Sequence, residues 1–263
     1  MPSLKMKLRC HFTLNLALAM LTQFVKHFVA HPNKLQVKGF KRMYVNFIKR
    51  VLDIIVSIVA LPFVLIIIAV LAPIIKLEDA GPVFYNAGRV GRGGCDFKMY
   101  KLRSMRVNAP DLVMEDGSTY NGADDPRMTK IGAFMRKTSL DEIPQFLNVL
   151  KGDMSLIGPR PDLRRECELY TGEEALKLNV KPGITGYAAV YGRNSLPWRQ
   201  RLKLDVYYVK HISFLLDVKI FFRTFATVFK QEGIYVKEDS ENAAKSCNIS
   251  DATSNKNLDS AKK

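Results

Sequence analysis

The longest hydrophobic run in the chain extends from Val51 to Ile75 and contains very few polar residues. A helix of about 25 residues would measure roughly 37 Å, which is enough to cross a bilayer. Asp53 lies near the start of the run, Pro62 in its middle and Pro73 near its end. Because a proline inside a helix removes a hydrogen bond and bends the axis, the pattern predicts a membrane helix that is broken at Pro62.

The charge on the N-terminal side of this run predicts its orientation. Cytoplasmic flanks of membrane helices are enriched in Lys and Arg. Six basic residues precede the run: Lys34, Lys38, Lys41, Arg42, Lys49 and Arg50. The sequence after the run is also basic, so both flanks can be cytoplasmic, which requires a helix that enters and leaves one leaflet. Hydropathy by itself favours a single kinked span, because re-entrant segments are the rarer solution.

The first 33 residues combine a basic start with an apolar stretch, as a signal peptide does. No Ala-x-Ala cleavage site follows, and Lys26 and His27 stand there instead. Several apolar residues also fall on one helical face, namely Leu14, Leu18, Leu21, Val25 and Phe28. A membrane-surface helix therefore fits this segment about as well as a signal peptide.

The rest of the chain predicts short strands and several helices. Alternating residues on both sides of a glycine turn from Gly91 to Gly94 indicate a β-hairpin over residues 83–103. Helices are expected at about 127–137, 141–151, 163–179 and 197–231, and a disordered tail from about 237. The predicted fold class is α+β, mainly helical with a small hairpin, and associated with a membrane through the broken helix and amphipathic interfacial helices.

Composition adds a preference for anionic partners. The net charge is +15 and 48% of the residues are hydrophobic. This balance allows a buried core and favours nucleic acid, an anionic membrane surface or phosphorylated substrates. The four cysteines are widely separated and show no CxxC spacing. Neither a zinc site nor a disulfide framework is therefore expected, and reduced thiols indicate a cytosolic compartment.

Two adjacent carboxylates, Asp141 and Glu142, are the first candidates for chemistry. Ser139 and Glu142 have the spacing of a capping box, so the plain interpretation is the first turn of a helix. Pro144 weakens this interpretation, because a proline disfavours helical geometry at the residue before it. An irregular turn is therefore expected at the acidic pair.

Arg160 is the cation least suited to a solvated surface position. Pro159 and Pro161 flank it, stiffen its backbone and lower the entropy cost of binding phosphate. Acids near a stiffly held arginine suit phosphate chemistry, since carboxylates hold a metal or attack phosphorus while arginine binds the oxygens. Other charged residues keep a plain explanation as solvated charge or ion-pair partners: Arg103, Arg136, Arg193, Asp205 and Asp217.

Six stretches of the chain form a distinctive series. They are KRVLDIIVS (49–57), IKLEDAGPVFYNAGRVG (75–91), FKMYKLRSM (97–105), RKTSLDEIPQFLNVLKGDMSLIGPRP (136–161), VKPGITGYAAVYGRN (180–194) and LDVYYV (204–209). In this order they resemble the bacterial sugar transferase family, the monotopic phosphoglycosyl transferases that start polysaccharide and glycoprotein glycan assembly. A mild departure is Ser104, where a threonine is frequent in the family.

The resemblance implies that a UDP-sugar and a polyprenyl phosphate yield a polyprenyl diphosphate-sugar and UMP. It also implies Mg²⁺ and a covalent, ping-pong route. Asp141 would be the nucleophile on the sugar-bearing phosphorus and the metal ligand, with Glu142 as its acidic partner. The other positions carried over are Lys101 and Arg136 as polar site residues, Arg160 as a phosphate ligand, Arg193 near the nucleotide, and Asp205 as a further acid of the site.

On this resemblance the chain divides into four parts: an N-terminal extension (1–47), a re-entrant membrane helix (48–76), a catalytic domain (77–236) and a disordered tail (237–263). Nucleotide-sugars are cytoplasmic, so both flanks of the membrane helix are expected in the cytoplasm. The predicted location is the bacterial inner membrane, with the catalytic domain facing the cytoplasm. A half-buried helix would hold the acidic pair at headgroup depth.

Two other classes of function are weighed against this one. A basic binding module for nucleic acid or anionic lipid fits the charge, but the cations are spread along the chain without a base-stacking motif, so no nucleic-acid partner is expected. A secreted hydrolase fits the first 33 residues but not the second hydrophobic run. The sugar, the glycan pathway, a homodimer and the place of residues 1–42 in the mature protein stay open.

Overall fold

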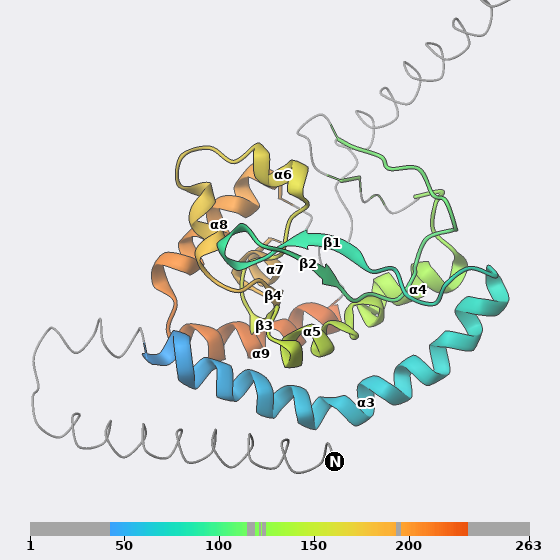
Figure 1. The fold of residues 1–263 in the computed structure, drawn as a ribbon, viewed down its shortest axis with the longest axis horizontal. Coiled ribbons are helices and arrows are strands. Elements are labelled where there is room, and N and C mark those ends of the chain that lie inside the picture. The colour runs from blue at the N-terminus through green and yellow to red at the C-terminus, as the bar shows by residue number, and fades with distance from the viewer. Residues whose placement is uncertain (1–42, 115–118, 121, 123–124, 193–195, 231–263) are drawn as a thin grey trace, which may run out of the picture. The chain divides into compact units, whose positions relative to one another are not determined.

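The computed structural model describes residues 43–114, 119–120, 122, 125–192 and 196–230 (Figure 1). Its α-helices are α3 (Lys49–Glu78), α4 (Lys130–Thr138), α5 (Gln145–Lys151), α6 (Arg164–Glu168), α7 (Tyr187–Tyr191), α8 (Trp198–His211) and α9 (Phe214–Lys230). The strands are β1 (Ala87–Val90), β2 (Asp96–Met99), β3 (Ser155–Ile157) and β4 (Gly183–Thr185). Shorter helical turns are η1 (Tyr44–Ile48), η2 (Arg92–Gly94), η3 (Leu140–Glu142) and η4 (Gly172–Asn179). The fold is mainly helical with a small hairpin, as predicted, and it also contains a second two-stranded sheet that the sequence did not predict.

Two predicted terminal segments fall outside this description. The membrane-surface helix expected within residues 1–33 and the tail expected over 237–263 both lie outside the described residues. The chain divides into two compact units, residues 1–44 and residues 45–263.

The long hydrophobic run forms α3, which stays helical through Pro62 and Pro73. The helix is curved but uninterrupted, so the structure does not show the break predicted at Pro62 (Figure 1). Among the described residues, this is the one helix that is both long enough and apolar enough to cross a membrane. Its passage through a membrane as a re-entrant segment stays a prediction.

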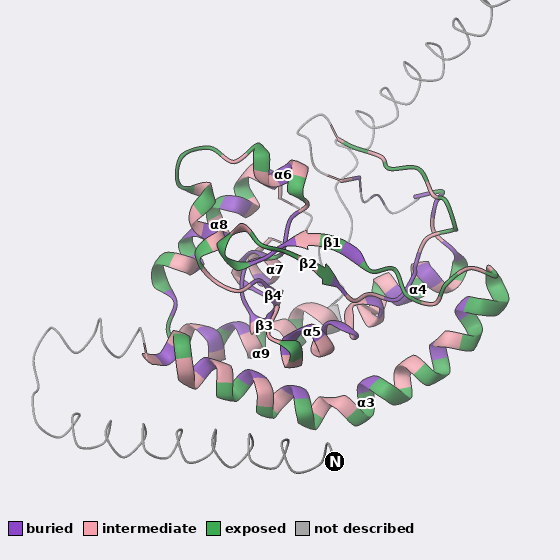
Figure 2. Cartoon of the chain, in the orientation of Figure 1, coloured by how far each residue is buried: buried purple, intermediate pink, exposed green. Residues whose placement is uncertain are grey.

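One narrow face of α3 packs against the protein and the rest is exposed (Figure 2). The buried residues recur at intervals of four or seven, which places them on one stripe of a helix: Lys49, Asp53, Ser57, Val64, Leu71 and Ile75. Leu71 and Ile75 form a core cluster with Leu102 and Met135. Large apolar side chains such as Val59 and Phe63, each 66% exposed, point away from this stripe.

The start of α3 is fixed by polar contacts to three different elements. Lys49 Nζ lies 2.5 Å from Asp217 Oδ2 in α9. Arg50 donates to the carbonyls of Val149 and Leu150 at the end of α5, where a cation also complements the helix dipole. Asp53 Oδ1 accepts a hydrogen bond from the Leu156 backbone in β3 at 3.0 Å.

The other end of α3 is fixed to the same unit. Glu78 accepts hydrogen bonds from the backbone N–H groups of Lys130 and Ile131, at 2.6 and 3.0 Å. These are among the N–H groups that the first turn of a helix leaves unpaired, so Glu78 acts as a cap for α4. Both ends of α3 thus contact one folded body.

Residues 83–103 form the predicted hairpin, with β1 and β2 antiparallel and Ala87 opposite Met99. The pairing continues beyond the strands, because Tyr85 N–H donates to the Lys101 carbonyl at 2.8 Å. Asn148 in α5 fastens this hairpin by accepting from Tyr100 N–H and donating to the Lys98 carbonyl, both at 2.8 Å. The second sheet pairs β3 with β4 in parallel.

The capping box expected at Ser139 is wrong. Ser139 has φ 59° and ψ 19°, makes no side-chain cap, and ends α4 in the left-handed conformation through backbone bonds to Arg136 and Met135. The helix expected over 141–151 begins only at Gln145, after the short 3-10 turn η3. The irregular turn expected from Pro144 is therefore confirmed, and Asp141 and Glu142 lie on it.

Candidate active site

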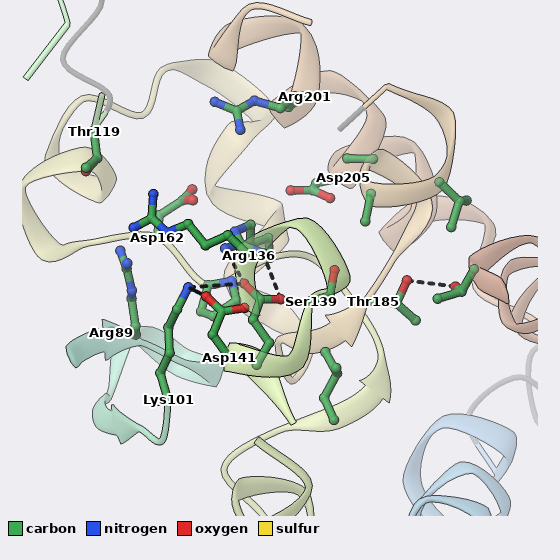
Figure 3. A pocket seen from close by; sticks show the side chains of 18 of the residues that line it. Arg89, Lys101, Thr119, Arg136, Ser139, Asp141, Asp162, Thr185, Arg201 and Asp205 are labelled. Carbon is green, nitrogen blue, oxygen red and sulfur yellow. Dashed lines mark hydrogen bonds and ion pairs between the residues drawn. The ribbon is translucent and has the colours of Figure 1, made fainter. Parts of the chain in front are cut away.

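A cavity of about 340 Å³ collects most of the predicted site residues (Figure 3). That volume lies within the range of small-molecule sites. Of the predicted residues, the cavity is lined by Lys101, Arg136, Asp141, Glu142, Arg160 and Asp205. Arg193 lies outside the described residues.

Asp141 is held rigidly at the wall of this cavity. Its residue is 2% exposed. Its backbone carbonyl accepts a hydrogen bond from Leu102 N–H at 2.9 Å, which ties the η3 turn to the hairpin. The left-handed Ser139 ends α4 just before it and turns the chain toward the cavity. A buried carboxylate on such a turn has little freedom to reorient, which suits a reacting group.

Lys101 enters the site from the continuation of β2 and faces both acids. Its Nζ lies 2.8 Å from Asp141 Oδ2 and 3.6 Å from Glu142 Oε1. Asp141 Oδ2 accepts no hydrogen bond, so its contact with Lys101 is an ion pair only. The Lys101 side chain is 16% exposed, and the pair is therefore only weakly screened by solvent.

Arg160 forms an ion pair with Glu142, the second acid of the pair. Its Nη2 lies 2.8 Å from Glu142 Oε1, while its own side chain is 53% exposed. The negative charge of Glu142 raises the pKa of Arg160 and outweighs the opposing effect of burial. Both acids of the pair thus have a cation in contact.

The turn that carries Arg160 is built on close backbone packing. Gly158 N–H donates to the Thr185 carbonyl at 2.8 Å, and Gly183 N–H to the Pro159 carbonyl at 2.9 Å. A Cβ at Gly183 would come within 2.1 Å of Gly158 N, so the approach requires glycine. The small parallel sheet and this turn together present Arg160 to the acidic pair.

Arg136 lies in the last turn of α4 and donates from Nε to Ser104 Oγ at 3.1 Å. The helix can approach Ser104 because residue 132 is glycine: a Cβ there would lie 1.9 Å from the Ser104 carbonyl oxygen. Arg136 reaches the same cavity as Asp141 (Figure 3). Its position suits contact with an anionic substrate in that cavity.

Asp205, from α8, belongs to a buried charge network in the cavity wall. Lys177 Nζ lies 2.6 Å from Asp162 Oδ2 and 3.0 Å from Asp205 Oδ2. Burial raises the pKa of Asp205 to about 6, even though Lys177 opposes it. Burial acts in the same direction on Asp162, but Lys177 and the Tyr170 hydroxyl outweigh it and lower its pKa. Lys177 thus contacts two carboxylates whose pKa values are shifted in opposite directions.

Sequence reasoning missed several residues of the cavity: Arg89, Asp162, Lys177 and Arg201. Arg89 and Asp162 stand inside or directly beside stretches that resembled the family. The positions of Arg89 and Asp162 along the chain do not indicate which other charged side chains lie close to them in the fold. For Lys177 the sequence held no signal beyond its place in a predicted helix.

No group of three or more Asp, Glu, His or Cys side chains converges anywhere among the described residues. An all-protein metal cage is therefore not found there. The pair Asp141 and Glu142 still fits Mg²⁺, which binds through one or two carboxylates and takes its other ligands from water and substrate phosphates. Asp141 Oδ2, buried without a hydrogen bond, is the oxygen best placed for this.

The model of the family described as bacterial sugar transferase matches residues 44–231. The chain belongs to the bacterial sugar transferase family. The matched range contains every cavity residue named above, so the buried acidic pair lies inside the family's domain.

The chain is 45% identical over 193 residues to the galactosyl transferase CpsE of Streptococcus agalactiae, covering 70% of this chain and 43% of CpsE. It is 42% identical over 190 residues to the uncharacterized sugar transferase EpsL of Bacillus subtilis, covering 71% of this chain and 90% of EpsL.

A third relative is the UDP-N-acetylgalactosamine-undecaprenyl-phosphate N-acetylgalactosaminephosphotransferase of Aeromonas hydrophila. It is 41% identical over 188 residues, which cover 69% of this chain and 44% of that protein. The chain therefore spans less than half the length of CpsE and of the Aeromonas protein, but nearly all of EpsL.

Proposed function

We propose that this chain transfers a sugar 1-phosphate from a UDP-sugar to a polyprenyl phosphate and so begins the assembly of a surface polysaccharide or another lipid-linked glycan. The observation that carries the proposal is Asp141, a buried carboxylate with an ion pair to Lys101, in a cavity ringed by arginines. Relatives named for galactosyl transfer and for N-acetylgalactosamine phosphate transfer to undecaprenyl phosphate support the same chemistry.

In the first step, an Asp141 carboxylate oxygen attacks the sugar-bearing phosphorus. An oxygen–phosphorus bond forms, the bridging P–O bond of the diphosphate breaks, and UMP leaves with the electron pair. In the second step, a phosphate oxygen of the lipid attacks the same phosphorus and releases the free carboxylate. This division lets two anionic substrates visit one site in turn, which avoids their mutual repulsion at low dielectric.

The protein's cations lower the barrier by neutralising charge. Lys101 holds the Asp141 carboxylate in place through the 2.8 Å contact, and Arg160 holds Glu142. The Lys101–Asp141 and Arg160–Glu142 ion pairs are formed before the phosphoryl group moves. Their electrostatic stabilisation is therefore preorganised. Mg²⁺, held by Asp141 and Glu142 together with substrate phosphates, would add Lewis-acid neutralisation of the phosphate oxygens.

We also propose that α3 enters and leaves the cytoplasmic leaflet of the inner membrane without crossing it. The support comes from its two ends: Lys49 pairs with Asp217, and Glu78 caps α4, so both ends are fixed to one body. A straight span would place those ends on opposite sides of a bilayer. The exposed apolar face of α3, with Val59 and Phe63, then contacts lipid.

The deciding experiment measures UMP release by the full chain in membrane nanodiscs. UDP-galactose and UDP-N-acetylgalactosamine head a panel of donors, because relatives carry those sugars in their names. Release is expected to depend on polyprenyl phosphate and Mg²⁺. A denatured sample quenched without acceptor is expected to carry the sugar phosphate mass on the peptide containing Asp141.

The Asp141→Asn variant tests the nucleophile. It keeps the size of the side chain but removes the attacking carboxylate, so both UMP release and the peptide adduct are expected to be lost. Full turnover by this variant would rule out the aspartyl intermediate. Lys137→Ala, a change in the last turn of α4 that leaves the cavity residues intact, serves as the matched control.

A further inference from the structure

Arg89 in β1 is a partly buried cation without a protein counter-ion in contact. Its Nε is inaccessible to solvent and has no hydrogen-bond partner. Among the described residues, the cations with the most buried side chains each contact an aspartate: Lys49 with Asp217, Arg103 with Asp79, Arg127 with Asp125 and Lys177 with Asp162. An unpaired buried charge is costly, so Arg89 needs an explanation.

The surroundings of Arg89 make this cost larger. Burial lowers the pKa of Arg89, and the like charge of Arg160 lowers it further. Glu166 and Asp162 act in the opposite direction but make no ion pair with it. Two arginines that line one cavity, one of them without an ion-pair partner, form a site for an anion.

The position of Arg89 indicates which anion. Lys101 contacts both acids and Arg160 contacts Glu142, so these two cations are already engaged beside the attacking oxygen. Arg89 lines the same cavity as Asp141 but makes no ion pair with Asp141 or Glu142. It is therefore a cation of the cavity that the acidic pair does not already engage (Figure 3).

We propose that Arg89 binds the phosphate of the leaving nucleotide, the one attached to the nucleoside rather than to the sugar. This inference rests on the proposed function. In a diphosphate the two phosphorus atoms are neighbours, so a cavity cation that does not engage the acidic pair is available to the phosphate that departs. As the bridging bond breaks, that phosphate gains a negative charge, which the fixed guanidinium neutralises.

The test compares binding of UMP and uridine to the full chain in nanodiscs, for the wild type and for Arg89→Met. The variant keeps the length of the side chain and removes its charge. UMP affinity is expected to fall about 10- to 100-fold, as for a lost charged hydrogen bond, and uridine affinity to stay unchanged. Arg92→Met, in the exposed hairpin turn outside the cavity, is expected to bind UMP like the wild type.

Three outcomes would overturn the inference while leaving the proposed function intact. The first is wild-type UMP affinity in Arg89→Met. The second is unchanged UMP affinity with a raised KM for polyprenyl phosphate, which would place the lipid phosphate on Arg89. The third is an equal loss of uridine and UMP binding. Failure of the wild type itself to bind UMP or UDP-sugars would instead overturn the proposed function.

Thermal unfolding of the ligand-free protein separates a binding role from a structural one. Because the Arg89 side chain makes no hydrogen bond or ion pair, Arg89→Met is expected to keep the wild-type Tm or to raise it. UMP is expected to raise the Tm of the wild type more than that of the variant. A lowered Tm in Arg89→Met together with an unchanged response to UMP would show that Arg89 serves folding only.

Discussion

Lys101 Nζ and Asp141 Oδ2 lie 2.8 Å apart, although the two residues belong to different segments that are distant in the sequence. Lys101 follows β2, and Asp141 lies on the turn before α5. The Leu102 N–H bond to the Asp141 carbonyl holds the two backbones together at this point. The ion pair is therefore set by the scaffold rather than by flexible side chains.

Replacing Lys101 by methionine is expected to lower kcat by about 10²- to 10³-fold, because one preorganised charge is lost next to the reacting carboxylate. The substrate KM is expected to change much less. Lys101→Arg keeps the charge and is expected to recover part of the rate. The measurement is steady-state UMP release with varied donor, and an unchanged kcat in Lys101→Met would contradict the assigned role.

Asn148 is expected to control both stability and activity from outside the cavity. It is fully buried and links β2 to α5 through two hydrogen bonds. Asn148→Ala leaves a buried N–H and a carbonyl unpaired, which costs about 2–4 kcal/mol of unfolding free energy. Chemical denaturation measures this loss. Asn148→Asp keeps the acceptor for Tyr100 N–H but turns a buried carboxylate oxygen toward the Lys98 carbonyl and Asp153, so a loss at least as large as for alanine is expected at neutral pH.

The stability of the protein is expected to respond to Asp205 between about pH 4 and pH 6. The folded pKa of Asp205 is raised from 3.8 to about 6, so in this window the folded state holds a proton that the unfolded state has lost. Stability therefore decreases as the pH rises through the window, by on the order of 2–3 kcal/mol in total.

Asp162 acts in a different pH range. Its pKa is lowered, so the stability it contributes is present above about 4 and is lost as the pH falls below that value. Melting curves from pH 3 to pH 7 for the wild type and Asp205→Asn separate the two groups. The variant is expected to lose only the decrease between pH 4 and pH 6. Parallel curves for the two proteins would show that Asp205 does not titrate there.

The ends of α3 are expected to be accessible from the same side of the membrane. Asn46 and Ala80 flank the helix and are both exposed. In a chain whose native cysteines are replaced by serine, a cysteine at either position is expected to react with an impermeant maleimide in inverted vesicles and not in intact spheroplasts. Labelling of the two positions from opposite sides would show that α3 spans the bilayer.

Several features could be predicted from the chain because they depend on local patterns. The apolar run predicts the long helix α3, and alternation around Gly91 to Gly94 predicts the hairpin. Pro144 predicts the irregular turn that carries Asp141. Each of these depends on backbone restrictions or periodicity within a few residues, which the sequence states directly.

Local patterns failed where two interpretations share one signal. Ser139 has the spacing of an N-terminal cap, but it closes the preceding helix in the left-handed conformation. The choice depends on the packing of α4 against Ser104, where Gly132 permits a close approach. That contact joins distant parts of the chain, so no window around Ser139 contains it.

Local sequence patterns account for the components of the site: an acidic pair on an irregular turn, an arginine between two prolines, and an apolar helix before them. The folded structure alone shows that Lys101 faces Asp141, that Lys177 contacts Asp162 and Asp205, and that the Arg89 side chain has no counter-ion in contact. Ion pairs form through space over a few ångströms, and spacing along the chain does not encode which charges the fold brings within that distance.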